Sequence, residues 1–209
     1  MAKLLYIQTS PRGQRSKSNT IADAFVAEYA NKNPHDKIEK LNLFEFDMPS
    51  FDGATIEAKY VILHGKNDYT GEQKQAWSRV EEIIDDFKSA DKYVLATPMW
   101  NFSIPYRLKQ YIDIVVQPGY TFGFAETGDY KGLVRGRKMV AVYARGGEYK
   151  GAGTKFDFQS PYVKAIFNLI GIMDIQELIV EPTLQGSPEQ VQQIQEQAIE
   201  KAKELALQF

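Results

Sequence analysis

The segment Pro98-Met99-Trp100-Asn101-Phe102 combines residue types that suit a planar ligand. It follows the apolar run 93–96 and precedes Ser103-Ile104-Pro105, which is typical of a helix start. A buried strand that ends in Met99, Trp100, Asn101 and Phe102 presents a flat ring and an amide at the edge of a sheet. Ligands of α/β proteins bind at that edge. We therefore expect these four residues to contact a ligand.

The loop at residues 10–19 has the composition of a phosphate site. Ser10, Ser16, Lys17 and Ser18 offer hydroxyl and ammonium donors before a helix that is expected to begin near Thr20. Backbone N–H groups and the helix dipole attract anions at such a position. The alternative is a solvated, serine-rich helix cap. The chain has no G-x-x-x-x-G-K-[ST] motif, and no G-x-G-x-x-G follows its first strand, so a mononucleotide phosphate fits better than a Walker or Rossmann ligand.

A third segment, Ala144-Arg145-Gly146-Gly147, follows another apolar run. Without Cβ atoms, Gly146 and Gly147 let the backbone lie against a planar ligand and direct its N–H groups at ring carbonyls. A glycine pair after a strand is also common in a simple turn. Taken by itself, Arg145 is interpreted as a surface charge.

Apolar runs and helical patterns alternate along the chain. Five runs rich in β-branched and aromatic residues predict strands at 4–9, 38–43, 93–97, 139–143 and 175–180. Between and after them, apolar residues recur at helical spacing at 21–29, 77–87, 108–115 and 191–205. Two capping boxes, Thr70 with Gln73 and Ser187 with Gln190, support the helix starts. The alternation predicts a single domain over residues 1–209, an α/β three-layer sandwich with a five-stranded parallel sheet of flavodoxin-like order 2-1-3-4-5 and helices on both faces.

In that order the loops after strands one, three and four meet at one crevice. An anion site, an aromatic and amide edge and a glycine face together describe a phosphorylated planar heterocycle, for which flavin mononucleotide (FMN) is the simplest candidate. Two long stretches, 44–69 and 119–134, are expected to be lids, substrate walls or contact surfaces. The second carries Tyr120, Phe122, Phe124 and Tyr130.

Composition limits the partners. The chain has 209 residues, 25 basic and 27 acidic, with a formal net charge of -2, which argues against a nucleic-acid partner or a membrane surface. It has no cysteine, so disulfides and thiol chemistry are excluded and a reducing compartment is favoured. The short apolar start is too short for a signal peptide, and we expect a cytoplasmic protein. His35 and His64 are expected in solvated turns, and no metal site is expected.

The three segments, together with 103–113 and Thr121-Phe122, resemble the FMN-dependent NADH-azoreductase family of flavodoxin-like quinone and azo-compound reductases. The resemblance implies that Ser10 and Ser16 to Ser18 hold the phosphate and ribityl end, that Met99 to Phe102 lie along the isoalloxazine, and that Ala144 to Gly147 contact its pyrimidine end. Trp100 and Ala144 depart from the family, which often has Tyr and Ser or Thr there; each change removes a hydroxyl.

The resemblance further implies an enzyme with non-covalent FMN and no catalytic side chain of its own. NADH would reduce the flavin, and a quinone or azo compound would then take its place and be reduced by two electrons in a ping-pong exchange. Tyr120 and Phe124 are expected to contact the substrate, with packing on their own domain as the alternative. A homodimer with the flavin pocket at its interface is also implied.

Two other functions keep the same fold. A flavodoxin-type one-electron carrier would bind flavin without its own turnover, but such carriers tend to be shorter and strongly acidic. A phosphate-ester hydrolase or an inert scaffold would lack the flavin altogether. Fold alone does not decide between them.

Overall fold

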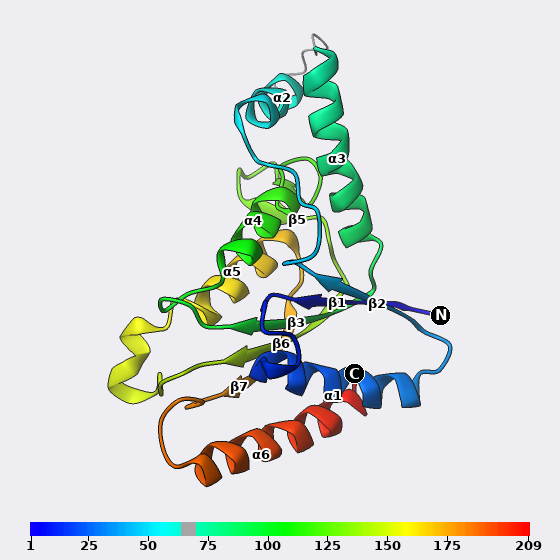
Figure 1. The fold of residues 1–209 in the computed structure, drawn as a ribbon. Helices are drawn as coiled ribbons and strands as arrows, with labels where there is room; N and C mark the ends of the chain where they lie inside the picture. The colour runs from blue at the N-terminus through cyan, green and yellow to red at the C-terminus, as the bar shows by residue number, and fades with distance from the viewer. Residues whose placement is uncertain (64–69) are drawn as a thin grey trace.

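The computed structural model describes residues 1–63 and 70–209 and has a parallel five-stranded sheet at its centre (Figure 1). The strands are β1 (Lys3–Gln8), β2 (Lys37–Asn42), β3 (Lys92–Pro98), β6 (Lys138–Ala144) and β7 (Asp174–Val180), in the order β2-β1-β3-β6-β7. This order confirms the predicted flavodoxin-like sheet. The inner strands read as continuous apolar runs because helices cover both of their faces.

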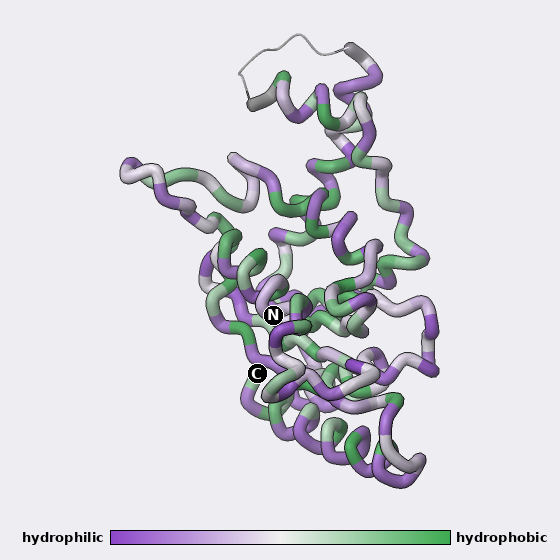
Figure 2. Tube along the Cα trace, turned by 90° about the vertical axis from the view of Figure 1, so that its left-hand side faces the viewer, coloured by the Kyte–Doolittle hydropathy of each residue, from purple (hydrophilic) through white to green (hydrophobic). Residues whose placement is uncertain are grey.

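Helices form a layer on each face of the sheet. α1 (Lys17–Lys32) and α6 (Pro188–Ala206) cover one face, and α3 (Gly71–Lys88), α4 (Tyr106–Val115) and α5 (Ser160–Ile170) cover the other (Figure 1). Both predicted capping boxes are present, at Thr70 before α3 and at Ser187 before α6. In Figure 2, α6 alternates hydrophilic and hydrophobic residues, as expected for a helix with one buried face. Among the described residues, no helix is long and apolar enough to cross a membrane.

The long stretches have more structure than the sequence indicates. The stretch 44–69, expected to be a lid, substrate wall or contact surface, contains α2 (Gly53–Leu63), which packs on α3. Helix α5 was also not predicted, although Val163, Phe167 and Ile170 are buried along it. His64 lies outside the described residues, while His35 is exposed in the turn before β2, as expected.

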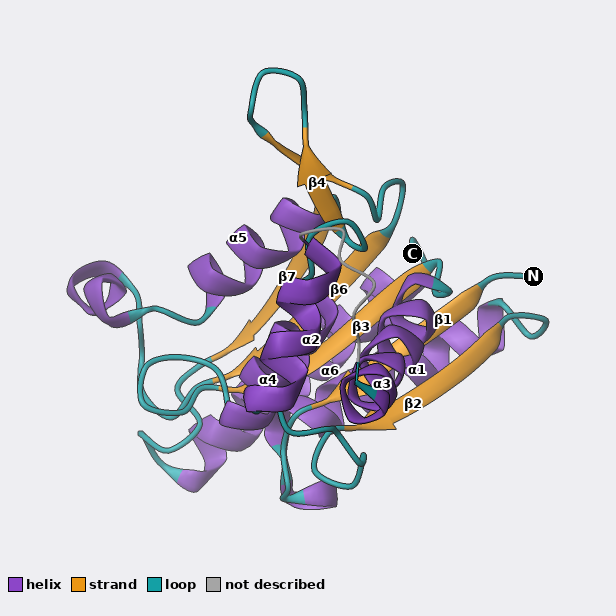
Figure 3. Cartoon of the chain, turned by 90° about the horizontal axis from the view of Figure 1, so that it is seen from above, coloured by secondary structure: helices purple, strands orange, loops and turns teal. Residues whose placement is uncertain are grey.

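The second long stretch forms an antiparallel hairpin of β4 (Phe122–Phe124) and β5 (Tyr130–Gly132). It packs beside α5, where a Cβ atom on Gly132 would stand 2.4 Å from the Gly171 backbone nitrogen. Figure 3 shows that the hairpin projects at the end of the sheet where β6 and β7 begin. The ligand-binding edge of such a sheet is the opposite one.

Candidate functional site

The loop after β1 brings its serines to the first turn of α1. A short 3-10 helix (Gly13–Arg15) leads into Ser16, the N-cap residue, whose hydroxyl accepts a hydrogen bond from the Asn19 N–H at 3.4 Å. The Ser16 and Ser18 hydroxyl oxygens lie 3.2 Å apart, and the Ser10 hydroxyl accepts from the Arg12 N–H at 3.4 Å. All three serines are buried. Two of the hydroxyls predicted for an anion site, those of Ser16 and Ser18, therefore lie side by side at the start of α1.

The charge around this turn suits an anion. Residues 9–20 contain no Asp or Glu, and the first-turn N–H groups of a helix have no acceptor within the helix. The Lys17 ammonium, however, hydrogen-bonds to Gln195 on α6. Hydroxyl and backbone donors, rather than Lys17, are thus what this conformation offers to a phosphate.

The segment after β3 is a tight turn with a strained backbone. Trp100 and Ser103 exchange two backbone hydrogen bonds, both 2.9 Å long. Between them Asn101 has φ 47° and Phe102 has φ 68°, the signature of a type I′ turn. Asn tolerates this conformation, whereas a bulky Phe adopts it only when its surroundings compensate the strain. The turn exposes both side chains at the edge of the sheet.

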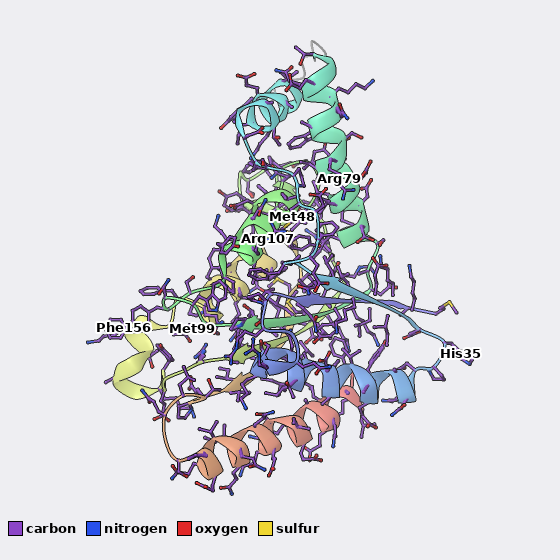
Figure 4. The ribbon with its side chains drawn as sticks, in the orientation of Figure 1. His35, Met48, Arg79, Met99, Arg107 and Phe156 are labelled. Carbon is purple, nitrogen blue, oxygen red and sulfur yellow. The ribbon has the colours of Figure 1, made fainter. Side chains whose placement is uncertain are left out.

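Aromatic residues from the loop before α5 supply those surroundings. The Phe102 ring stacks on Phe156, with centroids 5.2 Å apart, and meets Tyr149 edge-on at 6.2 Å. The Phe158 N–H donates to the Phe102 carbonyl at 3.0 Å. Figure 4 shows Phe156 and Met99 at the same end of the sheet, opposite His35. Sequence reasoning missed this loop, although its aromatic residues close to Gly151 and Gly153 were a visible signal.

Trp100 borders an open pocket on the other side of the turn. Its ring lies 5.9 Å from Phe44 and 6.3 Å from Tyr106, centroid to centroid. The pocket has a volume of about 660 Å³ and is lined by Phe51, Asn101 and Tyr162 among others. A flat apolar molecule has both space and ring surfaces here.

The loop after β6 corrects one expectation. Arg145 is not a surface charge: its side chain is 2% exposed and its guanidinium pairs with Asp157 at 2.9 Å and Glu181 at 3.3 Å. Its side chain therefore points into the protein, so only the backbone of this segment is open to a ligand. The Met99 N–H donates to the Ala144 carbonyl at 2.9 Å, which places this loop directly beside the turn.

Gly146 and Gly147 pack against the side chains of Leu184 and Gln185, which leave little room for a larger residue. A Cβ on Gly146 would lie 3.0 Å from a methyl carbon of Leu184, and one on Gly147 would lie 3.5 Å from the Gln185 amide nitrogen. Below them, burial and the Glu177 carboxylate raise the pKa of Tyr143, which keeps that phenol neutral. The strip beside the glycines therefore offers backbone donors rather than titrating groups.

Tyr120 and Phe124 do not join these loops within the chain. The Tyr120 hydroxyl accepts from the Trp77 indole N–H at 2.9 Å and donates to Glu81 at 2.7 Å, so it is held against α3. Phe124 is 62% exposed on the hairpin, beside Phe122 and Tyr130. Because the hairpin stands at the other end of the sheet, substrate contact by Phe124 would have to come from a second copy of the chain.

The residues present fit a phosphorylated planar heterocycle. Hydroxyl and N–H donors suit the phosphate, the Met99 to Phe102 turn offers apolar surface, and the glycine strip offers ring-directed donors. The three segments lie at the carboxyl ends of β1, β3 and β6, which are neighbours in the sheet. The predicted convergence is thus present in the structure.

Comparison with known proteins agrees with this geometry. The family model for the flavodoxin-like fold matches residues 2–206. An FMN-dependent NADH:quinone oxidoreductase of Nitratidesulfovibrio vulgaris (strain DP4) is 49% identical over 213 residues, covering 100% of both chains. One from Desulfotalea psychrophila (strain LSv54 / DSM 12343) is 44% identical, covering 90% of this chain and 88% of that one.

Solved structures give the same result. An FMN-dependent NADH-azoreductase from Bacillus anthracis str. Ames Ancestor, determined in complex with FMN, superposes with a TM-score of 0.86 at 32% identity, covering 99% of this chain and 100% of that one. An azoreductase from Bacillus anthracis str. Sterne superposes with a TM-score of 0.91 at 27% identity over the whole of both chains. The chain belongs to the flavodoxin-like family of FMN-dependent NADH:quinone oxidoreductases and NADH-azoreductases.

Proposed function

We propose that the protein is an FMN-dependent oxidoreductase that uses NADH to reduce quinones and azo compounds by two electrons. The observation that carries the proposal is the meeting of three chemically different segments at one edge of the sheet: a serine-lined helix start, an aromatic turn and a glycine strip. Relatives of the chain are named as FMN-dependent, NADH-using reductases, which supports the proposal.

Each segment has one task in the proposal. Ser10, Ser16 and Ser18, with the N–H groups of the first turn of α1, hold the FMN phosphate. The turn from Met99 to Phe102 lies along the isoalloxazine, and the Gly146 and Gly147 N–H groups face its pyrimidine end. When bound, FMN supplies the hydride acceptor and donor, so the chain needs no nucleophile or metal of its own.

The protein's contribution to turnover is orientation and electrostatics. Backbone N–H groups beside the ring stabilise the negative charge that reduction places there. NADH and the acceptor use the same open face in turn, next to Trp100 and the pocket that contains Phe51 and Tyr162. In a homodimer, Tyr120 and Phe124 of the second copy complete the wall of this pocket.

The first experiment is the visible spectrum of the purified protein, before and after reconstitution with FMN. We expect a yellow protein that releases FMN on denaturation, and the absence of saturable flavin binding refutes the proposal. Steady-state rates of quinone reduction should then give parallel double-reciprocal lines when NADH is varied at several quinone concentrations, because NAD⁺ leaves before the quinone binds. Intersecting lines contradict the shared face, and a flavoprotein that does not oxidise NADH is a carrier.

A further inference from the structure

Arg145 is one of the largest fully buried side chains among the described residues, and it joins three separate parts of the chain. Its Nε donates to the Gln159 side-chain oxygen at 3.1 Å, one terminal nitrogen pairs with Glu181 at 3.3 Å and the other with Asp157 at 2.9 Å. Its guanidinium carbon also lies within 6 Å of two aromatic ring centroids, 5.6 Å from Tyr143 and 5.8 Å from Tyr149. Each guanidinium nitrogen thus faces an oxygen, with the nitrogen beside Asp157 held by its ion pair and not by a hydrogen bond. Lysine cannot reproduce this planar arrangement.

The Arg145 main chain also makes hydrogen bonds to other segments. Its N–H donates to the Val180 carbonyl at 3.0 Å, and its carbonyl accepts from both the N–H and the hydroxyl of Thr183 at 2.9 Å. The next carbonyl, of Gly146, accepts from the Leu184 N–H at 3.0 Å. The position of the glycine strip therefore follows from the contacts of its buried neighbour.

The same side chain connects to the aromatic turn. Asp157, its carboxylate partner, accepts from the N–H groups of Gln159 and Ser160 at 3.0 and 3.1 Å, at the start of α5. Gln159 donates in turn to the Thr97 carbonyl at 3.4 Å, at the end of β3. Phe158, between Asp157 and Gln159 in the chain, donates its backbone N–H to the Phe102 carbonyl. Arg145 thus links the two segments that border the flavin ring in the proposed function.

We infer that Arg145 is a positioning residue: its buried fork sets the glycine strip and the strained turn in register, so that their backbone groups meet the flavin ring. The inference rests on the proposed function. It differs from a purely structural role, because misplaced N–H groups bind the charged, reduced ring less well than the neutral, oxidised one. The inference also predicts that loss of Arg145 weakens binding of the flavin ring and not binding of the phosphate.

The test compares Arg145→Met and Arg145→Lys with Arg137→Met. Arg137 flanks the other end of β6, and its replacement removes a partly exposed ion pair of 2.7 Å with Asp91, a charged contact far from the ring. Dissociation constants of FMN and riboflavin are measured by fluorescence on the apoprotein, together with the two-electron midpoint potential and the melting temperature. Lysine keeps a cation beside the carboxylates and provides a folded variant if Arg145→Met does not fold.

For Arg145→Met we expect FMN and riboflavin to weaken by the same factor, about tenfold or more, the equivalent of one lost hydrogen bond. A further tenfold loss for the reduced flavin lowers the midpoint potential by about 30 mV. Arg145→Lys should stay closer to Arg145→Met than to the wild type in both readouts, and Arg137→Met should change only the melting temperature.

Three results overturn the inference: unchanged flavin binding and potential in Arg145→Met, full recovery by lysine, or a loss confined to FMN and absent for riboflavin. These results differ from failure of the proposed function, in which the wild type itself binds no flavin.

Discussion

Replacing Ser16 with Ala separates the phosphate site from ordinary helix stability. The Ser16 hydroxyl caps α1 by accepting from the Asn19 N–H at 3.4 Å and lies 3.2 Å from the Ser18 hydroxyl. Losing the cap costs about 1 kcal/mol of unfolding free energy. Losing a hydrogen bond to a phosphate dianion costs roughly 1.5 to 3 kcal/mol of binding free energy.

The second figure predicts that the dissociation constant of FMN rises roughly 10- to 150-fold. Riboflavin has the same ring and ribityl chain but no phosphate, so its dissociation constant should be unchanged. Quenching of flavin fluorescence on titration with apoprotein measures both constants, and thermal unfolding of the apoprotein measures the loss of the cap.

Ser187→Ala is the matched control. Ser187 caps α6 in the same way, accepting from the Gln190 N–H at 3.3 Å, and is exposed. It should lower the melting temperature by a similar amount and leave FMN binding intact. Equal losses of affinity for FMN and riboflavin in Ser16→Ala would place the phosphate elsewhere. A loss of FMN affinity in Ser187→Ala would show that general destabilisation of the protein is enough to weaken FMN binding.

Three further changes test other parts of the structure. Gly132→Ala should destabilise the fold by about 1 to 3 kcal/mol, because its Cβ meets the backbone that ends α5, whereas Gly123→Ala on the same hairpin meets nothing within 4 Å and should be mild in urea unfolding. Phe124→Asp should reduce both dimer content in sedimentation and quinone turnover without unfolding the sheet; a monomeric, fully active wild type would contradict this. Hydrogen bonds from the Tyr29 hydroxyl and the Ala2 N–H hold the pKa of Asp36 below its ordinary value. The stability from Asp36 is present above its unfolded pKa and lost as pH falls through the folded one, so Asp36→Asn should flatten the acid limb of melting temperature against pH, and an unchanged limb would refute it.

Much of the fold is readable in the sequence because its signals are local. Strands such as β3 and β6 are apolar over most of their length, since helices cover both faces of a parallel sheet. Thr70 and Ser187 mark helix starts through contacts only three residues away. Helices α2 and α5 were missed, although the buried positions along α5 have helical spacing.

The candidate site also has features that the sequence predicts and features that it does not. That the segments after β1, β3 and β6 meet follows from strand order, which the alternation of elements predicts. The left-handed backbone of Phe102 could not be predicted, because it is stabilised by Phe156 and Tyr149 from a loop about fifty residues further along the chain.

Arg145 gives the clearest case. By residue type it is a surface charge, and its burial depends on Asp157 and Glu181, carboxylates from two later segments that compensate its desolvation. Tyr120, proposed to contact the substrate of a second copy, is bonded within its own chain to Trp77 and Glu81, on a helix that precedes it by some forty residues. The sequence by itself determined the order of elements and the chemical types at the site, because periodicity, caps and glycines act over a few residues. Only the tertiary structure decided which side chains face inward and what holds them, because those contacts join residues that are distant in sequence.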